Sequence, residues 1–294
     1  MEKVNPKLKN REWGTFINFL TDFAFKKIFE NEKLLIDFLN EVLEEECKVI
    51  SLDYLKSEQL GMTEEDRKAV YDIYCRNERD ECFIIEMQVV YQKHYLDRML
   101  FYSTFPIQKY AIKGKWDFEL KPLYCISIVN FEIFDKEGYL NHVDFIWREA
   151  MEKATGKVNF IFIELPKFKK TLRQSETRLD SWIYCIKHLG DLKEQPARLR
   201  DEIFDELFKT ARINKLKEKE MGEYRKSVTE YEDVKICMRD FGELNMEKGL
   251  EKGLEKGMLA KTKEFTKKCL KMGFSVNIIS ELTDLTPEQI NQMR

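Results

Sequence analysis

The sequence predicts an α/β fold, and three features of the chain support that prediction. Apolar residues recur at helical spacing over residues 15–46, and again over 92–113 and 178–215. Between these segments lie short apolar runs rich in β-branched and aromatic residues, which are typical of strands. The order helix, strands, helix, strands, helices belongs to α/β domains, and the closely spaced runs favour some antiparallel neighbours.

The composition supports a folded domain and limits its partners. Of 294 residues, 43% are hydrophobic and 13% aromatic, which is enough for a core rather than a disordered chain. Charged residues make up 35% but nearly cancel, to a net charge of −3, so any nucleic-acid surface has to be local. The chain shows no signal-peptide stretch, no apolar run long enough for a bilayer, and seven dispersed cysteines without a C-x-x-C pair. We therefore expect a cytoplasmic protein with reduced thiols and no membrane partner.

The N-terminal helical region, residues 15–46, divides into two segments. Thr21 or Asp22 is placed to cap the first segment, and Asn31 or Glu32 to begin the second. We expect two consecutive helices here.

Three apolar runs follow these helices, at residues 47–55, 68–75 and 81–90. The polar residues 76–81 separate the second run from the third and suit a hairpin loop. The two runs are therefore predicted to be neighbouring strands.

The second half of the predicted domain repeats this alternation. Residues 92–113 are expected to form a helix that Pro106 interrupts or kinks and that Gly114 ends. Further strands are expected within 122–131, 143–147 and 159–168, before helical spacing resumes near 178–215.

From about residue 216 the composition changes. Residues 216–245 are highly charged and are predicted to form a solvated helix or linker, and 246–294 hold the repeat EKGLEKGLEKGM and a small helical region. The four-residue period places the three glycines of the repeat in one stripe, and each mid-helix glycine costs about 1 kcal/mol relative to alanine. The stripe indicates close packing against another backbone in an oligomer, a hinge, or a repeat expansion without special function.

The predicted strand FIIEMQVV, residues 83–90, carries polar residues in its middle. Glu86 and Gln88 are two apart and therefore project from the same face. Asp72 lies in the preceding apolar run, so a hairpin would bring its carboxylate near that of Glu86. A cation such as Mg²⁺ or Mn²⁺ would offset the cost of burying two carboxylates, with the main-chain carbonyl of Met87 as a third ligand. The alternative is an edge strand whose polar face meets solvent.

Asp72, Glu86 and Gln88 form a D…E-x-Q pattern, which three further stretches accompany: TDFAFKKIF, RMLFYSTFPIQKY and IFIELPKF, at residues 21–29, 98–110 and 161–168. With the glycine-repeated tail, they resemble the Rpn (recombination-promoting nuclease) and transposase-like family of the PD-(D/E)XK nuclease superfamily. The resemblance implies a restriction-endonuclease-like core over residues 1–215, with a central mixed sheet flanked by helices, and a small helical C-terminal appendage. It also implies metal-dependent hydrolysis of DNA phosphodiesters.

On this resemblance, Asp72 and Glu86 correspond to metal ligands, with Mg²⁺ or Mn²⁺ as the cofactor. Gln88 stands where most of the wider superfamily has lysine, and an amide can orient a water but cannot act as a base or supply positive charge. Lys26 is placed to supply that charge, unless it is a solvated lysine on an amphipathic helix. Asp22 is expected to cap its helix rather than to act as a third ligand.

Residues expected to contact DNA lie on or beside the predicted helix 92–113: Lys93, Arg98, Tyr102, Gln108 and Lys109. Arg98 and Tyr102 are four apart and share a face, which suits a charged clamp and a hydrogen-bond donor for the scissile phosphate. The alternative is that Arg98 pairs with an acid such as Glu86 and Tyr102 fills the core. Glu164 is expected to be structural, in contact with Lys167 or a helix terminus.

Three functions are consistent with these features. The first is a metal-dependent DNA endonuclease, expected to be a dimer because two active sites are the simplest way to cut both strands. The second is a catalytically weak or inactive nuclease-fold protein that acts as an oligomeric nucleic-acid- or protein-binding module. The third is a DNA-mobilising factor, in which the same chemistry serves recombination or mobile-element DNA.

Overall fold

The computed structural model describes residues 13–43, 47–59, 69–109, 117–272, 275–283 and 285–292. Contacts divide the chain into two units, Met1–Glu232 and Asp233–Arg294. The first unit contains the sheet and the helices that cover it, and the second contains helices.

The first two helices form where the sequence predicts them. Helix α1 spans Asp22–Phe29 and α2 spans Glu32–Leu43, and each turns its apolar side to the core. Thr21 caps α1, because its side-chain oxygen accepts a hydrogen bond from the Ala24 N–H at 3.4 Å. The alternative cap, Asp22, is therefore wrong: it is the first residue of the helix.

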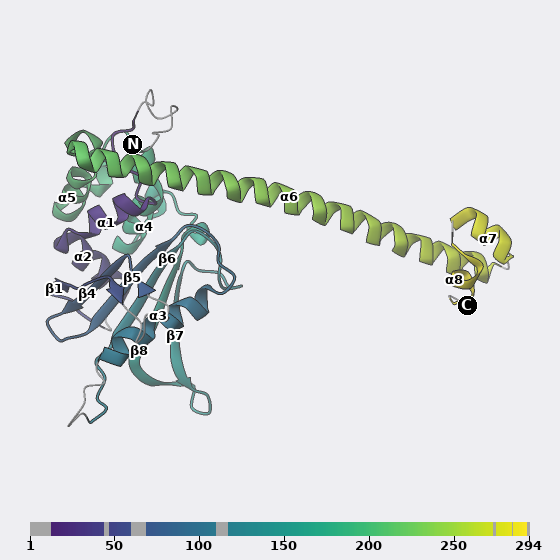
Figure 1. The fold of residues 1–294 in the computed structure, drawn as a ribbon, viewed down its shortest axis with the longest axis horizontal. Coiled ribbons are helices and arrows are strands. Elements are labelled where there is room, and N and C mark those ends of the chain that lie inside the picture. The colour runs from purple at the N-terminus through teal and green to yellow at the C-terminus, as the bar shows by residue number, and fades with distance from the viewer. Residues whose placement is uncertain are drawn as a thin grey trace. The chain divides into compact units, whose positions relative to one another are not determined.

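Six strands form one mixed sheet in the order β1-β4-β5-β6-β8-β7 (Figure 1). Its strands are β1 (Leu52–Tyr54), β4 (Ile73–Asn77), β5 (Cys82–Gln88), β6 (Leu123–Val129), β7 (Leu140–Trp147) and β8 (Glu152–Glu164). The central strands β5, β6 and β8 are parallel, and the outer pairs are antiparallel. This arrangement confirms the predicted α/β fold with a mixed central sheet.

The apolar run 68–75 is not one strand, contrary to the prediction. Its first part forms β3 (Ala69–Val70), which pairs with β2 (Glu58–Gln59) in a separate two-stranded sheet. Strand β4 begins only at Ile73, and Asp72 lies in a bend between the two. The chain then turns through the predicted hairpin into β5.

Helix α3, Tyr95–Lys109, connects β5 to β6. A crossover of this kind is required because the two strands are parallel. Pro106 lies inside α3 and does not interrupt it. The expected end at Gly114 lies outside the described residues.

The two faces of the sheet bury different helices. Helices α1, α2, α4 (Arg178–His188) and α5 (Glu202–Thr210) pack on one face, and α3 packs on the other (Figure 1). Strand β5 contributes Phe83 and Ile85 to the first face and Ile84 to the second. By the two-residue period of a strand, Glu86 and Gln88 share the α3 face with Ile84.

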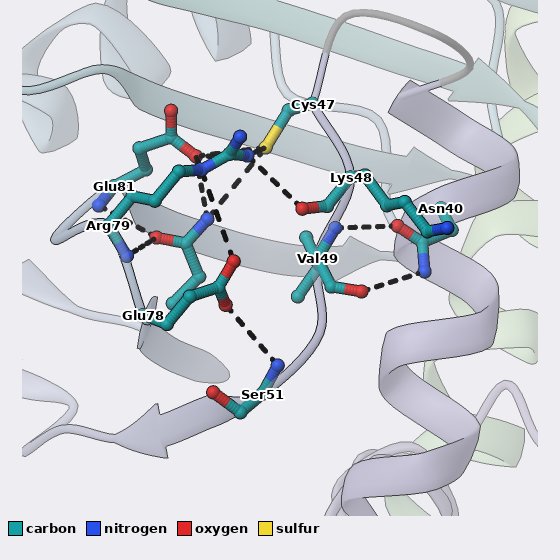
Figure 2. Close-up of polar contacts among 9 residues, drawn as sticks. Asn40, Cys47, Lys48, Val49, Ser51, Glu78, Arg79 and Glu81 are labelled. Carbon is teal, nitrogen blue, oxygen red and sulfur yellow. Dashed lines mark hydrogen bonds and ion pairs between the residues drawn. The ribbon is translucent and has the colours of Figure 1, made fainter.

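Polar contacts hold the β4–β5 turn against the segment that follows α2 (Figure 2). The Arg79 guanidinium donates to the carbonyl oxygen of Lys48 at 3.1 Å and lies 2.9 Å from Cys47 Sγ, and Glu81 accepts from the same thiol at 3.0 Å. Burial and then the Glu81 carboxylate raise the pKa of Cys47 to about 12, so this thiol is protonated at neutral pH. The cysteines described by the structure are free thiols, as expected: Cys47, Cys75, Cys82, Cys125, Cys185 and Cys237.

The C-terminal part of the chain is helical. Helix α6 spans Glu218–Lys271, and its backbone continues through the glycine repeat. It is followed by α7 (Val276–Thr283) and α8 (Pro287–Asn291), which starts after a capping box at Thr286. Within the described part of the chain, no helix combines the length and the apolar composition needed to cross a membrane.

Candidate active site

The site lies at the carboxyl end of β5, where Asp72 and Glu86 meet. The Asp72 N–H donates to Glu86 Oε1 at 3.0 Å, and the Met87 N–H donates to Asp72 Oδ2 at 2.9 Å. One oxygen of Glu86 thus binds the backbone of Asp72, and one oxygen of Asp72 binds the backbone of Met87, so that each carboxylate has a second oxygen that does not bind backbone. This reciprocal pair accounts for the bend at Asp72, because side chains replace the ladder bonds that would continue β4.

A cation faces the second oxygen of each acid. Arg98 Nη2, from α3, lies 3.1 Å from Glu86 Oε2, and the Glu86 side chain is only 3% exposed. Lys26 Nζ, from α1, lies 3.9 Å from Asp72 Oδ1 and 2.6 Å from Asp22 Oδ1. Lys26 Nζ thus lies beside the acid pair although its side chain is 47% exposed. Asp22 pairs with Lys26, and its charge also acts on Asp72, whose pKa is raised by burial and then by Asp22.

Gln88 orients Arg98. Its side-chain oxygen accepts a hydrogen bond from Arg98 Nη1 at 3.1 Å, and its side-chain nitrogen donates to the Val90 carbonyl at 3.1 Å. The same Nη1 donates to Gln92 Oε1 at 3.1 Å. One guanidinium group therefore contacts Glu86, Gln88 and Gln92.

Burial and mutual repulsion shift the ionisation of the two acids. Burial and then the Asp72 carboxylate raise the pKa of Glu86 to about 8. Burial likewise raises the pKa of Asp72, although the Met87 N–H and Lys26 act in the opposite direction. A divalent cation between these acids would favour the ionised form of both.

The two cations of the cluster stay charged. Burial lowers the pKa of Lys26, but its hydrogen bond to Asp22 and the surrounding carboxylates outweigh burial, so that the net pKa is raised. Burial also lowers the pKa of Arg98, and the Glu86 carboxylate more than compensates.

The donor set suits a hard divalent cation such as Mg²⁺ or Mn²⁺. Asp72 Oδ1 and Glu86 Oε2 are the carboxylate oxygens that do not bind backbone, and oxygen ligands are those that such ions prefer. Because the Met87 N–H points at Asp72, its carbonyl lies along the same edge of β5. Among the described residues, no group of three or more His, Cys, Asp or Glu side chains is placed to hold an ion. A main-chain oxygen such as that of Met87 would therefore be the third metal ligand that the protein supplies.

The structure does not bring every expected DNA-binding residue into this cluster. The Tyr102 ring lies 4.8 Å from the Arg98 guanidinium and 5.4 Å from the Tyr71 ring, so it packs beside the cluster. Lys93 is exposed just before α3. Gln108 and Lys109 are exposed at the far end of α3, about 15 Å along the helix axis from Arg98.

The sequence analysis did not single out three residues near the cluster, namely Gln92, Tyr95 and Ser127. Gln92 contacts Arg98, and the buried Ser127 lies opposite Glu86 in the β5–β6 register. Burial raises the pKa of Tyr95, and among the described residues neither its hydroxyl nor that of Ser127 has a hydrogen-bond partner. The sequence contains a signal for Ser127, because it is a polar residue inside the apolar strand LYCISIV, just as Glu86 is a polar residue inside β5.

Glu164, at the end of β8, has the structural role expected of it. Its buried carboxylate pairs with Lys167 Nζ at 2.5 Å and accepts hydrogen bonds from the backbone N–H groups of Ile133 and Phe134. Asn141 donates to it at 3.0 Å. Glu164 therefore anchors the loop that follows β6.

Comparison with protein families gives a match that covers most of the chain. The family model for PD-(D/E)XK nuclease family transposases matches residues 19–240. The matched range includes every residue of the cluster: Lys26, Asp72, Glu86, Gln88 and Arg98. Comparison with curated proteins and with solved structures gives no match. The chain therefore belongs to the PD-(D/E)XK nuclease family transposases.

Proposed function

We propose that the protein is a metal-dependent DNA endonuclease that hydrolyses phosphodiester bonds in recombination or mobile-element DNA. The observation that carries this proposal is the reciprocal Asp72–Glu86 pair, which leaves one oxygen of each acid directed at a cation. Membership of a nuclease family supports DNA as the substrate. Nucleases of this superfamily generally use divalent metal ions.

Asp72, Glu86 and the Met87 carbonyl would hold Mg²⁺ or Mn²⁺. When bound, such an ion polarises a phosphoryl oxygen and lowers the pKa of a water molecule. Arg98 and Lys26 would bind the phosphate and stabilise the negative charge that develops on it, because both cations already lie at the acid pair. Tyr102, Gln108 and Lys109 would follow the DNA strand along α3.

The contact between Gln88 and Arg98 supports a positioning role for the amide that stands in place of the usual lysine. The Gln88 oxygen accepts from Arg98, whereas a lysine ammonium at this position would meet the guanidinium as a second positive charge. Arg98 therefore supplies the cation at the end of β5, and Gln88 positions it.

Cleavage of supercoiled plasmid tests the proposal. We expect purified protein with Mg²⁺ or Mn²⁺ to nick or linearise the plasmid, and Asp72→Asn or Glu86→Gln to reduce the rate at least about 100-fold, as expected when charge-stabilising groups are lost. The matched control is Glu202→Gln, because Glu202 is an exposed acid on α5. Equal cleavage by all variants would contradict the assignment.

The same assay addresses Gln88. We expect Gln88→Lys to be slower than the parent protein, because the new ammonium would displace Arg98 from Glu86. A faster Gln88→Lys enzyme would show instead that the site lacks a cation. If no variant cleaves and all bind DNA equally, the protein acts as a nucleic-acid-binding module of the nuclease fold.

A further inference from the structure

A hollow of about 230 Å³ lies at the start of α3, and one of its lining residues, Gln92, contacts Arg98 of the Asp72–Glu86 cluster. It is lined by the segment that enters α3 and by the residues that follow β6, among them Tyr91, Gln92, Lys93, Leu96, Phe131 and Glu132. Both walls follow the carboxyl ends of parallel strands, where α/β sheets commonly bind ligands. We call it the Tyr91 hollow.

Tyr91 presents an open aromatic surface that is supported from behind. The residue is 59% exposed, whereas Phe131, against which its ring packs, is 7% exposed. The Tyr91 and Phe131 rings meet edge to face with centroids 5.5 Å apart, and Phe131 meets Tyr95 in the same way at 5.6 Å. The Arg98 guanidinium lies 5.9 Å from the Tyr95 ring. A row of packed rings thus connects Tyr91 to the candidate site.

One guanidinium group joins the hollow to the acid pair. Arg98 contacts Glu86 through Nη2 and Gln92 through Nη1, each at 3.1 Å, and Gln92 lines the hollow. A phosphate bound at Arg98 would therefore place an adjoining base within reach of Tyr91.

The charges of the hollow favour a base over a phosphate. Lys93 is accompanied by the carboxylates of Asp97 and Glu132, so a second phosphate would meet net repulsion. Asp97 is engaged by His94 Nδ1 at 3.3 Å, which leaves Glu132 to accept hydrogen bonds from a base amino group. A base in a duplex has its faces covered by its neighbours, so only an unpaired base can stack on Tyr91.

We propose that the Tyr91 hollow binds one unpaired nucleobase of the substrate strand, stacked on Tyr91 and next to the phosphate held by Arg98. The inference rests on the proposed function and narrows it: the preferred substrate is DNA with single-stranded character at the cleavage position. The aromatic surface supplies affinity for any base, because every base offers a π face.

Binding measurements on the full-length protein test the inference separately from cleavage. The probe is a fluorescein-labelled oligodeoxynucleotide of about 20 nucleotides, longer than most single-strand sites. Its anisotropy is followed as a single strand and as a duplex, in EDTA so that no metal-dependent cleavage occurs. We expect Tyr91→Ala to weaken single-strand binding about tenfold and duplex binding less than twofold, and Tyr91→Phe to bind like the parent protein. The matched control is Trp147→Ala, because Trp147 is an exposed aromatic residue on β7.

The outcomes separate the two proposals. If Tyr91→Ala has the parent's melting temperature and binds single strands as tightly as the parent, the inference is overturned, and plasmid cleavage by the parent protein still decides the endonuclease proposal. Equal loss of single-strand and duplex binding also overturns the inference, because stacking of an unpaired base would affect single strands selectively. If Tyr91→Ala selectively loses single-strand binding and the parent protein cleaves nothing, the hollow stands and the endonuclease proposal fails.

Discussion

Glu86 places a carboxyl group inside an apolar strand, although a protein core normally excludes such a group. Its side chain is 3% exposed, and its oxygens are bound by one backbone N–H and one guanidinium group. These contacts offset only part of the cost of desolvation, since the pKa of Glu86 still rises to about 8. A group held at such a cost is typical of a functional site.

The raised pKa predicts how stability changes with pH. Between pH 4.5 and about 8 the folded protein keeps a proton on Glu86 that the unfolded chain releases, so the free energy of unfolding falls as pH rises through this window. Glu86→Gln removes this contribution, and without added metal we expect it to stabilise the protein by roughly 1 to 4 kcal/mol at pH 8 and negligibly at pH 4.5.

Urea unfolding at several pH values measures this difference. Glu202→Gln, an exposed acid-to-amide change, is expected to follow the parent protein throughout. A Glu86→Gln effect that is the same at pH 5 and pH 8 would show that Glu86 is ionised in the folded state over the whole range.

At the scale of elements, the site depends on the junction of β5, α3 and the loop after β6. Strand β5 supplies the acid and α3 supplies the cation. The parallel β5–β6 pair requires a crossover, and α3 makes it across the face of the sheet that carries Glu86. The loop after β6 supplies Phe131 to the Tyr91 hollow. Glu164 holds that loop from the end of β8.

Glu164→Gln is expected to loosen this junction. Lys167, whose side chain is largely buried, would lose its charged partner, and breaking a buried ion pair costs about 3 to 5 kcal/mol. Because the amide keeps part of the hydrogen bonding, we expect about 2 to 4 kcal/mol of destabilisation in urea unfolding. Glu202→Gln should change it by less than about 0.5 kcal/mol. A similarly small effect of Glu164→Gln would mean that the loop is held by its apolar contacts.

At the scale of the whole molecule, α6 extends from the unit that contains the sheet into the C-terminal unit. Its backbone stays helical through three glycines, which would make an isolated helix marginal at about 1 kcal/mol each. Packing against a second copy of the chain would restore that stability. The division of the chain into residues 1–215, 216–245 and 246–294 stays a prediction, and so does the dimer.

Removing residues 246–294 tests the dimer. We expect the full-length protein to sediment as a dimer and the chain that ends at residue 245 as a monomer, because the glycine stripe would be lost. Retained circular dichroism of the sheet-containing unit is the control for folding. An oligomer of unchanged stoichiometry after the deletion would rule out self-association through the repeat.

The sequence by itself determined which residues differ in polarity from their neighbours along the chain. Periodicity located most of the helices and strands, and the polar loop located the β4–β5 hairpin. The acids Asp72 and Glu86 stood out against apolar neighbours. These are local properties, so they can be read along the chain. The local pattern failed at Asp72, where side-chain hydrogen bonds from another strand end the ladder.

Only the tertiary structure decided how those residues act together. The contacts of Arg98 with Glu86, Gln88 and Gln92 depend on how α3 lies across β5, which no local pattern sets. The same is true of Lys26, which reaches the acids from a helix more than forty residues earlier in the chain. The Tyr91 hollow combines two loops that meet only because β5 and β6 are parallel neighbours. The sequence specifies the chemistry of each side chain, but tertiary packing sets the distances between side chains that make a site.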